Sequence, residues 1–284
     1  MTDLAAPTRT AYQGRIRGRW PLAFGIVLVA VPLLIAVFGA LLAPHDPDAS
    51  LGPPLAGPGT VGSLGTDSLG RDVMSRVLSG GRTTILIALG AAVTAELLGS
   101  AAGAFTALAR PAQAAVVTYL TRVLLALPGI LLLSALVSGF GSSPVLLYAA
   151  ATVVLVPSLV PVIAARTRIL ALQPWLEAAR FAGTGWPRLL LRELLPNLVP
   201  VMAADLATRF VTAVFLVSTA GFLGLGPAPP TPDWGVMISE AAPTLQQQPW
   251  PVIAPAALLG LLALGATLLT HRVIGRVTAG GSLG

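Results

Sequence analysis

The 284 residues include 17 basic and 11 acidic side chains, so only 10% of the chain is charged, against about 25% in a typical soluble domain. Hydrophobic residues make up 55% of the chain, and its mean hydropathy is +0.84. Transmembrane helices tolerate many glycines and prolines, and this chain has 30 and 25 of them. The composition therefore excludes an ordinary water-soluble enzyme and indicates a polytopic membrane protein.

Two missing residue types narrow the possible chemistry. The chain has no cysteine, which excludes disulfides, thiolate metal sites and cysteine nucleophiles. Every basic residue is arginine, so the lysine of a P-loop is absent and ATP hydrolysis by that route is excluded. His45 and His271 are far apart and form no metal-binding pattern. We expect no catalytic residue, no metal site and no binding to nucleic acid.

Six apolar runs are long enough to cross a bilayer. A polar tail, residues 1–20, precedes the first run, 21–43, which is about 34 Å long at the ~1.5 Å rise of a helix. This run resembles an uncleaved first helix more than a signal peptide. The other runs are 83–108, 114–140, 145–165, 198–220 and 252–273. The sequence thus predicts an all-α membrane protein with six transmembrane helices.

The distribution of arginines predicts how these helices are oriented. Six spans place both termini on one side, and twelve loop and tail arginines lie on that side against three on the other. Because cytoplasmic segments are enriched in basic residues, the tails 1–20 and 274–284 are predicted to be cytoplasmic. Two long loops, 44–82 outside and 166–197 inside the core 83–273, are where we expect function to concentrate.

The inner loop is predicted to form a short helix over residues 173–182. Pro174 suits a first helical turn, and Gly183 suits the left-handed residue that ends a helix. A second segment is expected to begin at residues 186–187 and return to the membrane. One face of the short helix gathers side chains that allow close approach to a partner: Trp175, Ala178, Ala179 and Ala182.

This loop resembles the EAA loop of ABC importer permeases in both residue type and spacing. The matching residues are Glu177-Ala178-Ala179, Gly183 and Leu194-Leu195-Pro196-Asn197. The resemblance implies that the loop docks into a groove on a separate ATPase, with Glu177, Ala178, Ala179, Gly183, Leu195 and Pro196 as coupling residues. An ordinary amphipathic segment at the membrane surface is the alternative.

The outer loop carries a second motif, and its residues match the LGTDxxGRDxxSR pattern of dipeptide and oligopeptide permeases. The motif residues are Gly65, Thr66, Asp67, Gly70, Arg71, Asp72 and Arg76. Thr66 or Asp67 is a candidate helix cap, followed by an apolar stripe of Leu69, Val73 and Val77. We favour a structural role that fixes the loop against the second helix. Contact with substrate through Arg71 or Asp72, or with a binding protein, stays open.

A third motif follows the fifth span and resembles the FLGLG and PPxPxWGxM segments of the same permeases. Its residues include Gly224, Gly226, Trp234 and Gly235. The glycines permit a tight re-entry of the chain. Trp234 is expected in the interfacial aromatic belt rather than stacked on a ligand.

Four charged residues fall inside predicted spans, where charge is costly and indicates function: Glu96, Arg122, Asp205 and Arg209. Asp205 and Arg209 are spaced to form an ion pair within one helix, and Arg122 is a candidate partner for Glu96. Arg122 also departs from the family pattern, which has an acidic residue shortly before this Leu-Pro step. Prolines 32, 128, 157, 161 and 255 are expected to kink helices.

The three motifs together resemble the dipeptide, oligopeptide and nickel group of ABC importer permeases, with the type I importer fold. The resemblance implies a homologous second permease, two cytoplasmic ATPases that bind ATP and Mg, an extracytoplasmic solute-binding protein and a bacterial inner membrane. The chain itself would hold no cofactor and would not be an enzyme. Di- or oligopeptides are the expected substrates; nickel or another small solute stays open. A proton-coupled secondary transporter using Glu96 and Asp205 is the alternative from another class.

Overall fold

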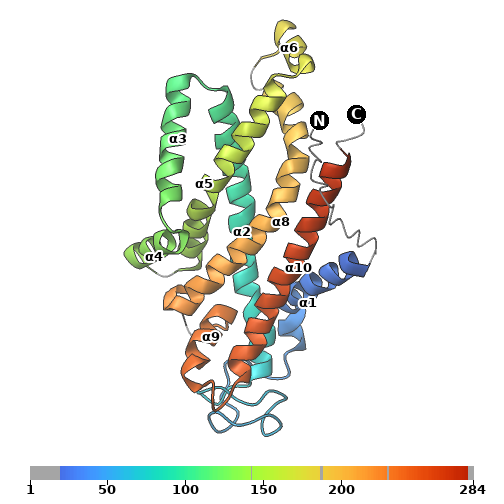
Figure 1. Cartoon of the computed structure of the whole chain (residues 1–284). Helices are drawn as coiled ribbons and strands as arrows, with labels where there is room; N and C mark the ends of the chain where they lie inside the picture. The colour runs from blue at the N-terminus through green and yellow to red at the C-terminus, as the bar shows by residue number, and fades with distance from the viewer. Residues whose placement is uncertain (1–19, 142, 186–187, 229, 281–284) are drawn as a thin grey trace, which may run out of the picture.

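The computed structural model describes residues 20–141, 143–185, 188–228 and 230–280 (Figure 1). Within these ranges the chain is helical, with two isolated β-bridges, Ser50–Arg71 and Thr66–Asp72, and no strand. The predicted tail 1–20 lies almost wholly outside the described residues, as do residues 186 and 187, where a second loop segment was expected to begin.

Five helices are long and apolar enough to cross a membrane, and a bent pair raises the number to six if it counts as one span. The five are α1 (Trp20–Leu42), α2 (Val73–Leu108), α5 (Pro144–Ala171), α8 (Leu195–Ala220) and α10 (Trp250–Gly280). The bent pair is α3 (Pro111–Ala126) and α4 (Gly129–Phe140). The all-α prediction is therefore confirmed.

Helix α2 is the centre of the bundle, and small residues let its neighbours approach closely. Its side chains at Ala88, Ala91 and Ala95 are completely buried. At Gly99 an added Cβ would lie 2.6 Å from Leu159 Cβ of α5, and at Gly103 it would lie 2.8 Å from a backbone oxygen of α5. Small residues of this kind are the usual means by which transmembrane helices pack closely.

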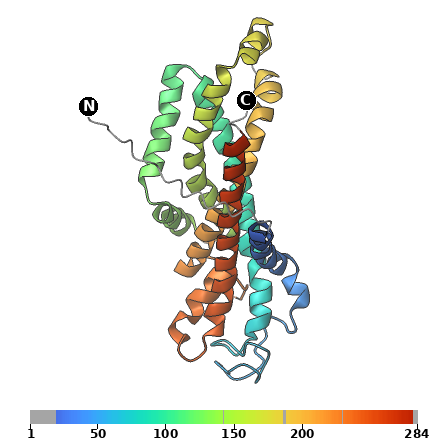
Figure 2. The ribbon, with the colours of Figure 1, turned by 45° about the vertical axis from the view of Figure 1, so that its right-hand side comes forward.

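The two long loops lie at opposite ends of the bundle. The short helix α6 (Pro174–Phe181) stands beyond the ends of α5 and α8, and the loop between α1 and α2 lies at the other end (Figures 1 and 2). The loop end also carries η2 (Gly221–Leu225), α9 (Trp234–Ala241) and η3 (Ala242–Thr244). A π-helical turn, η1 (Leu189–Leu194), leads into α8.

Several predicted boundaries are wrong. The outer loop was expected to reach residue 82, but α2 begins at Val73, because Asp72 caps it and the following polar residues are buried. The predicted span 114–140 bends by 92° at Leu127 and Pro128. A kink was expected at this proline, which cannot donate the backbone hydrogen bond that a straight helix needs there. Two helices also extend beyond their predicted spans. Helix α5 continues to Ala171, into the predicted inner loop, and α10 continues to Gly280, into the predicted C-terminal tail.

We predict that Gly99→Ala lowers the thermal stability of the protein in detergent. The added methyl group must displace Leu159, and overpacking of this kind costs about 1–3 kcal/mol. Gly260→Ala is the matched control, because a Cβ there meets nothing within 4 Å. The temperature at which half of the monodisperse protein is lost on heating should fall for Gly99→Ala but not for Gly260→Ala. Equal temperatures for the two variants would contradict close packing of α2 against α5.

Candidate functional site

The outer motif begins the second helix through Asp72. Its carboxylate accepts hydrogen bonds from the backbone N–H of Met74 (3.3 Å) and of Ser75 (3.2 Å), and it lies 3.2 Å from His45 Nδ1. The side chain is completely buried. Such a carboxylate satisfies the free N–H groups of the first helical turn. The prediction that Thr66 or Asp67 caps the helix is wrong, and Leu69 lies in a turn before it with its side chain exposed.

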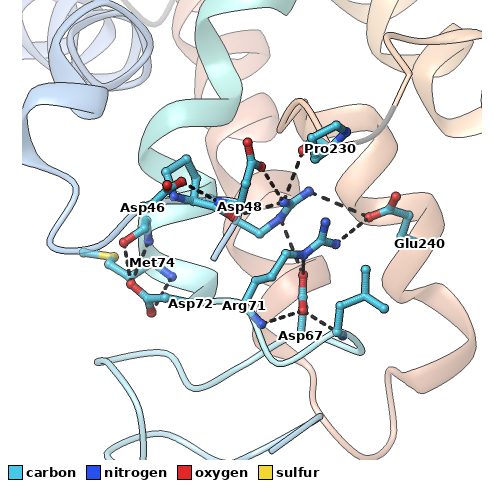
Figure 3. Close-up of polar contacts among 12 residues, drawn as sticks. Asp46, Asp48, Asp67, Arg71, Asp72, Met74, Pro230 and Glu240 are labelled. Atoms are coloured by element: carbon cyan, nitrogen blue, oxygen red, sulfur yellow. Dashed lines mark hydrogen bonds and ion pairs between the residues drawn. The ribbon is translucent and has the colours of Figure 1, made fainter. Parts of the chain in front are cut away.

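Two buried arginines flank this cap, Arg71 directly before it and Arg76 in the helix after it. They form an ionic cluster, hereafter the outer cluster, of Arg71, Arg76, Asp67, Asp48 and Glu240. Arg71 Nε donates to Asp67 Oδ2 at 2.7 Å and its Nη2 donates to Glu240 Oε2 at 3.3 Å (Figure 3). Arg76 is 2% exposed and lies within 4 Å of all three acids. The cluster joins the loop, α2 and α9, three segments distant in sequence.

Arg76 also donates to the backbone oxygens of Pro47 (3.2 Å) and Pro230 (3.4 Å). Gln248 Nε2 donates in the same way to the oxygens of Ala56 (2.8 Å) and Leu64 (3.1 Å). Three of these bonds hold the backbone of the glycine- and proline-rich outer loop, and the bond to Pro230 holds the segment before α9. The structural interpretation of the outer motif therefore agrees with the geometry.

Several motif glycines are required by the backbone of this loop. Gly65 has φ +77° and a Cβ there would overlap the oxygen of Ala56, while Gly70 has φ +76° and faces the oxygen of Gly52. Thr66 Oγ1 donates to Pro53 O at 2.7 Å and accepts from the N–H of Ala56 at 2.8 Å. The motif thus encodes the fold of the loop.

Trp234 is completely buried, and the prediction that it anchors in the interfacial belt is wrong. Its indole Nε1 donates to the oxygen of Val77 at 2.8 Å, and its ring lies against Gly81, where a Cβ would be 2.4 Å from Cζ2. A Cβ added at Gly235 would likewise overlap the backbone of α8, at the oxygen of Ser218. The ring packs α9 onto α2 because both its apolar face and its N–H find partners inside the protein.

Asp233 caps α9 just before this tryptophan. It accepts from the N–H of Gly235 (2.9 Å) and of Val236 (3.2 Å), and from Thr84 Oγ1 of α2 (2.5 Å). Burial raises the pKa of Asp233, and the three hydrogen bonds oppose that rise. Nearby, Gly224 has φ +78° and Gly226 abuts Val236, so both glycines serve the tight re-entry expected of them.

At the opposite end, α6 forms the predicted short helix of the inner loop. Gly183 has φ +74°, and the N–H of Thr184 donates to the oxygen of Ala179 at 3.2 Å, a Schellman C-cap. Leu176 is completely buried against Leu189 and Leu194, which fixes the helix to the segment leading into α8. This part of the sequence prediction holds.

The outer face of α6 keeps three of the four predicted residues, because Trp175, Ala178 and Ala182 are exposed. Ala179 is the exception, since it is half-buried and packs toward the Leu176 cluster. Phe181 is 90% exposed, the most exposed of the large hydrophobic side chains described. Leu195 and Pro196 are exposed at the start of α8, and the side chain of Glu177 lies outside the described part of the chain.

The four intramembrane charges pair differently from the prediction. Arg209 Nε donates to Asp205 Oδ2 at 2.7 Å, the expected pair within α8. Glu96 Oε2 lies 3.6 Å from the same Arg209 Nε, so its partner is Arg209 and not Arg122. Arg209 Nη1 also donates to Leu155 O (3.1 Å) and Ser158 Oγ (2.7 Å) of α5. One guanidinium therefore links α2, α5 and α8.

Comparison with known proteins identifies the family. Residues 101–279 match the family model described as "Binding-protein-dependent transport system inner membrane component". The chain is 31% identical over 252 residues to the di/tripeptide transport system permease protein DppC of Pseudomonas aeruginosa, which covers 86% of this chain and 83% of that protein. The chain belongs to this family.

Two further relatives of the permease come from Escherichia coli. The dipeptide transport system permease protein DppC of strain K12 is 31% identical over 252 residues, 86% of this chain and 84% of that protein. The glutathione transport system permease protein GsiD of Escherichia coli O6:K15:H31 is 32% identical over 249 residues, which cover 86% of this chain and 81% of that protein. The permease is thus a multi-pass inner-membrane transport component.

Sequence reasoning missed several residues that the permease uses. Glu240 and Gln248 complete the outer loop from a segment that carries no motif at those positions. Phe181 lies inside the EAA motif, but the sequence alone did not reveal its exposure, because that exposure depends on how α6 packs against the segment leading into α8. His45 was considered only as a metal ligand, whereas it contacts the cap Asp72. Within the described residues no group of three or more candidate metal ligands occurs.

We predict that Arg76→Ala loosens the outer loop. Removing the guanidinium leaves Asp67 without one of its two cations and two backbone oxygens without a donor, and breaking a buried pair typically costs about 3–5 kcal/mol. Cleavage within residues 51–64 by a broad-specificity protease should become faster. Arg82→Ala is the control, because Arg82 is exposed on the same helix; equal cleavage in both variants would contradict the role of the outer cluster.

We also predict a pH dependence from Asp233. Because its folded-state pKa is raised, the folded protein holds a proton that the unfolded chain releases near its ordinary value of about 3.9. The stability contributed by this group is complete below that value and is lost as pH rises through the raised pKa. The difference in thermal midpoint between the native chain and Asp233→Asn should therefore shift against the native chain as pH rises from about 4 upward. Asp46→Asn is the control, because Asp46 is exposed and lies outside the outer cluster.

Proposed function

We propose that the permease is the transmembrane subunit of an ATP-driven importer that takes up di- or oligopeptides by alternating access. The observation that carries this proposal is α6, a short helix fixed beyond the bundle with an exposed aromatic face. An exposed aromatic side chain on a rigid helix is what a groove on a partner protein can bind. The sequence of this helix also resembles the EAA loop.

The proposed partners follow from this arrangement. Two cytoplasmic ATPases bind ATP and Mg and engage α6, so the permease itself carries no cofactor and performs no catalysis. A homologous second permease completes the path. A solute-binding protein delivers substrate at the outer end, and α6 and both termini lie in the cytoplasm of a bacterium in this proposal. The arginine distribution supports this orientation.

In this mechanism ATP binding closes the two ATPases and displaces α6. The Leu176–Leu189–Leu194 contacts transfer the displacement to α8, and hydrolysis reverses it. The substrate class rests on the relatives named for di- and tripeptides. Glutathione, itself a small peptide, is the second candidate because one relative is named for it.

We predict that Phe181→Ala reduces both peptide uptake and recovery of the ATPase with the tagged permease by at least about tenfold. The reason is that truncating a central aromatic anchor of an interface costs about 2 kcal/mol or more. Gly183→Asp should have the same effect, because a side chain at φ +74° is strained and displaces the end of α6.

Phe38→Ala is the matched control, because it removes a Phe that is 51% exposed on α1, far in sequence from the inner loop. It should retain the ATPase and uptake. All variants should be present in the membrane at the level of the native chain. Normal uptake by both Phe181→Ala and Gly183→Asp would refute the proposed coupling.

A further inference from the structure

A cavity of about 210 Å³ opens between α2, α3 and α5. Its polar lining consists of Thr106 of α2, Thr118, Thr121 and Arg122 of α3, and Arg168 of α5. Apolar side chains of α3 and α5 complete its walls. We call this cavity the arginine groove.

The charges of the arginine groove are not balanced within the described chain. Arg122 and Arg168 are exposed, and neither makes an ion pair with a described residue. Helices α3 and α5 contain no acidic residue, and the single acid of α2, Glu96, lies beside Arg209. The hydroxyls of Thr118 and Thr121 likewise have no hydrogen-bond partner among the described residues. A ligand with negative charge would complete the site.

The position of Arg122 argues against lipid tails as the surroundings of the arginine groove. Arg122 lies 11 residues after Pro111, about 17 Å along α3 at a rise of ~1.5 Å per residue. It precedes by about one turn the 92° break at Leu127 and Pro128, and α4 lies near the middle height of the bundle (Figure 1). Both residues of the break are exposed.

Hydrocarbon tolerates neither an exposed charge nor a broken helix, unless protein or a water-filled cavity surrounds it. The break and Arg122 share one region of the bundle, so one surrounding must satisfy both. A water-filled cavity satisfies both, even where the proposed second permease covers part of this face, because water hydrates the guanidinium and bonds to the backbone groups that the break leaves free.

We propose that the arginine groove lines the aqueous route through the permease and binds the carboxylate of the transported solute through Arg122 and Arg168. Guanidinium and carboxylate form charge-assisted, often bidentate hydrogen bonds, and the two threonine hydroxyls add uncharged donors. The inference rests on the proposed import function and narrows its substrates to solutes with a free carboxylate, such as peptides with an unmodified C-terminus.

The first test measures the electrostatics of the arginine groove without transport. Since the chain has no cysteine, Thr118→Cys gives it a single thiol, which lies in the groove. Labelling of this chain is measured in the whole complex in membrane vesicles after the subunits are separated on a gel. An anionic water-soluble thiol reagent should label this thiol about five- to tenfold faster than a cationic reagent of equal size, because the guanidinium charges attract it. Adding Arg122→Gln should abolish most of this preference.

Leu120→Cys is the control for this experiment. Leu120 is 55% exposed on the same helix and does not line the groove, so its thiol should react only with a lipid-soluble maleimide. Equal rates for the two charged reagents at position 118, or labelling there by the lipid-soluble reagent alone, would overturn the proposal. The latter result would indicate that lipid occupies the groove.

The second test compares uptake of one peptide with uptake of its C-terminal amide by the reconstituted complex. Arg122→Gln should lower the preference for the free carboxylate by about tenfold relative to the native chain. The same binding protein delivers the peptides to the native complex and to the variant complex, so its own selectivity cancels when the two preferences are compared. Arg110→Gln, which changes an exposed arginine outside the groove, should leave the preference unchanged.

The outcomes separate the two proposals. An equal loss of both substrates in Arg122→Gln, or an unchanged preference, would overturn the carboxylate site. A native complex that imports neither peptide would contradict the proposed peptide function, while the labelling ratio at position 118 would still decide whether the arginine groove attracts anions.

Discussion

The structure depends on one constraint, which is that polar groups carried into or beside a bilayer must be satisfied within the protein. Helix α2 meets it at three levels. Its first turn is capped by Asp72, its next turn holds Arg76 inside the outer cluster, and its middle places Glu96 beside Arg209. The glycines and alanines between these polar positions let other helices approach closely enough to supply the partners.

The same constraint explains why long-range partners of the outer loop come from α9 and the segment after it. A loop rich in glycine and proline has few apolar side chains to bury, so its stability depends on hydrogen bonds to its own backbone. Arg76 and Gln248 provide such bonds from two sides. The loop and the α8–α10 connection therefore behave as one structural unit.

Sequence patterns predicted the helical class, the short helix α6 with its glycine cap and the ion pair of Asp205 with Arg209, because each depends on residues close in sequence. They failed where contacts between residues distant in sequence determine the position of a side chain. Trp234 was expected at the membrane surface, but Gly81 provides the space that buries it. Glu96 was paired with the wrong arginine, since helix–helix contacts cannot be read from spacing within one helix. A helix carrying Val73 and Val77 was expected within the outer loop, but its continuity with α2 was missed, because its first turn contains a charge that only the folded loop neutralises.

Helix α8, Leu195–Ala220, is 26 residues long and therefore about 39 Å at ~1.5 Å per residue. Arg209 lies near its midpoint and bonds it to α2 and α5. A helix held near its centre moves its two ends in opposite directions when it tilts. A tilt of about 5° would shift each end by about 2 Å, inward at one face of the membrane and outward at the other, with Arg209 as the pivot.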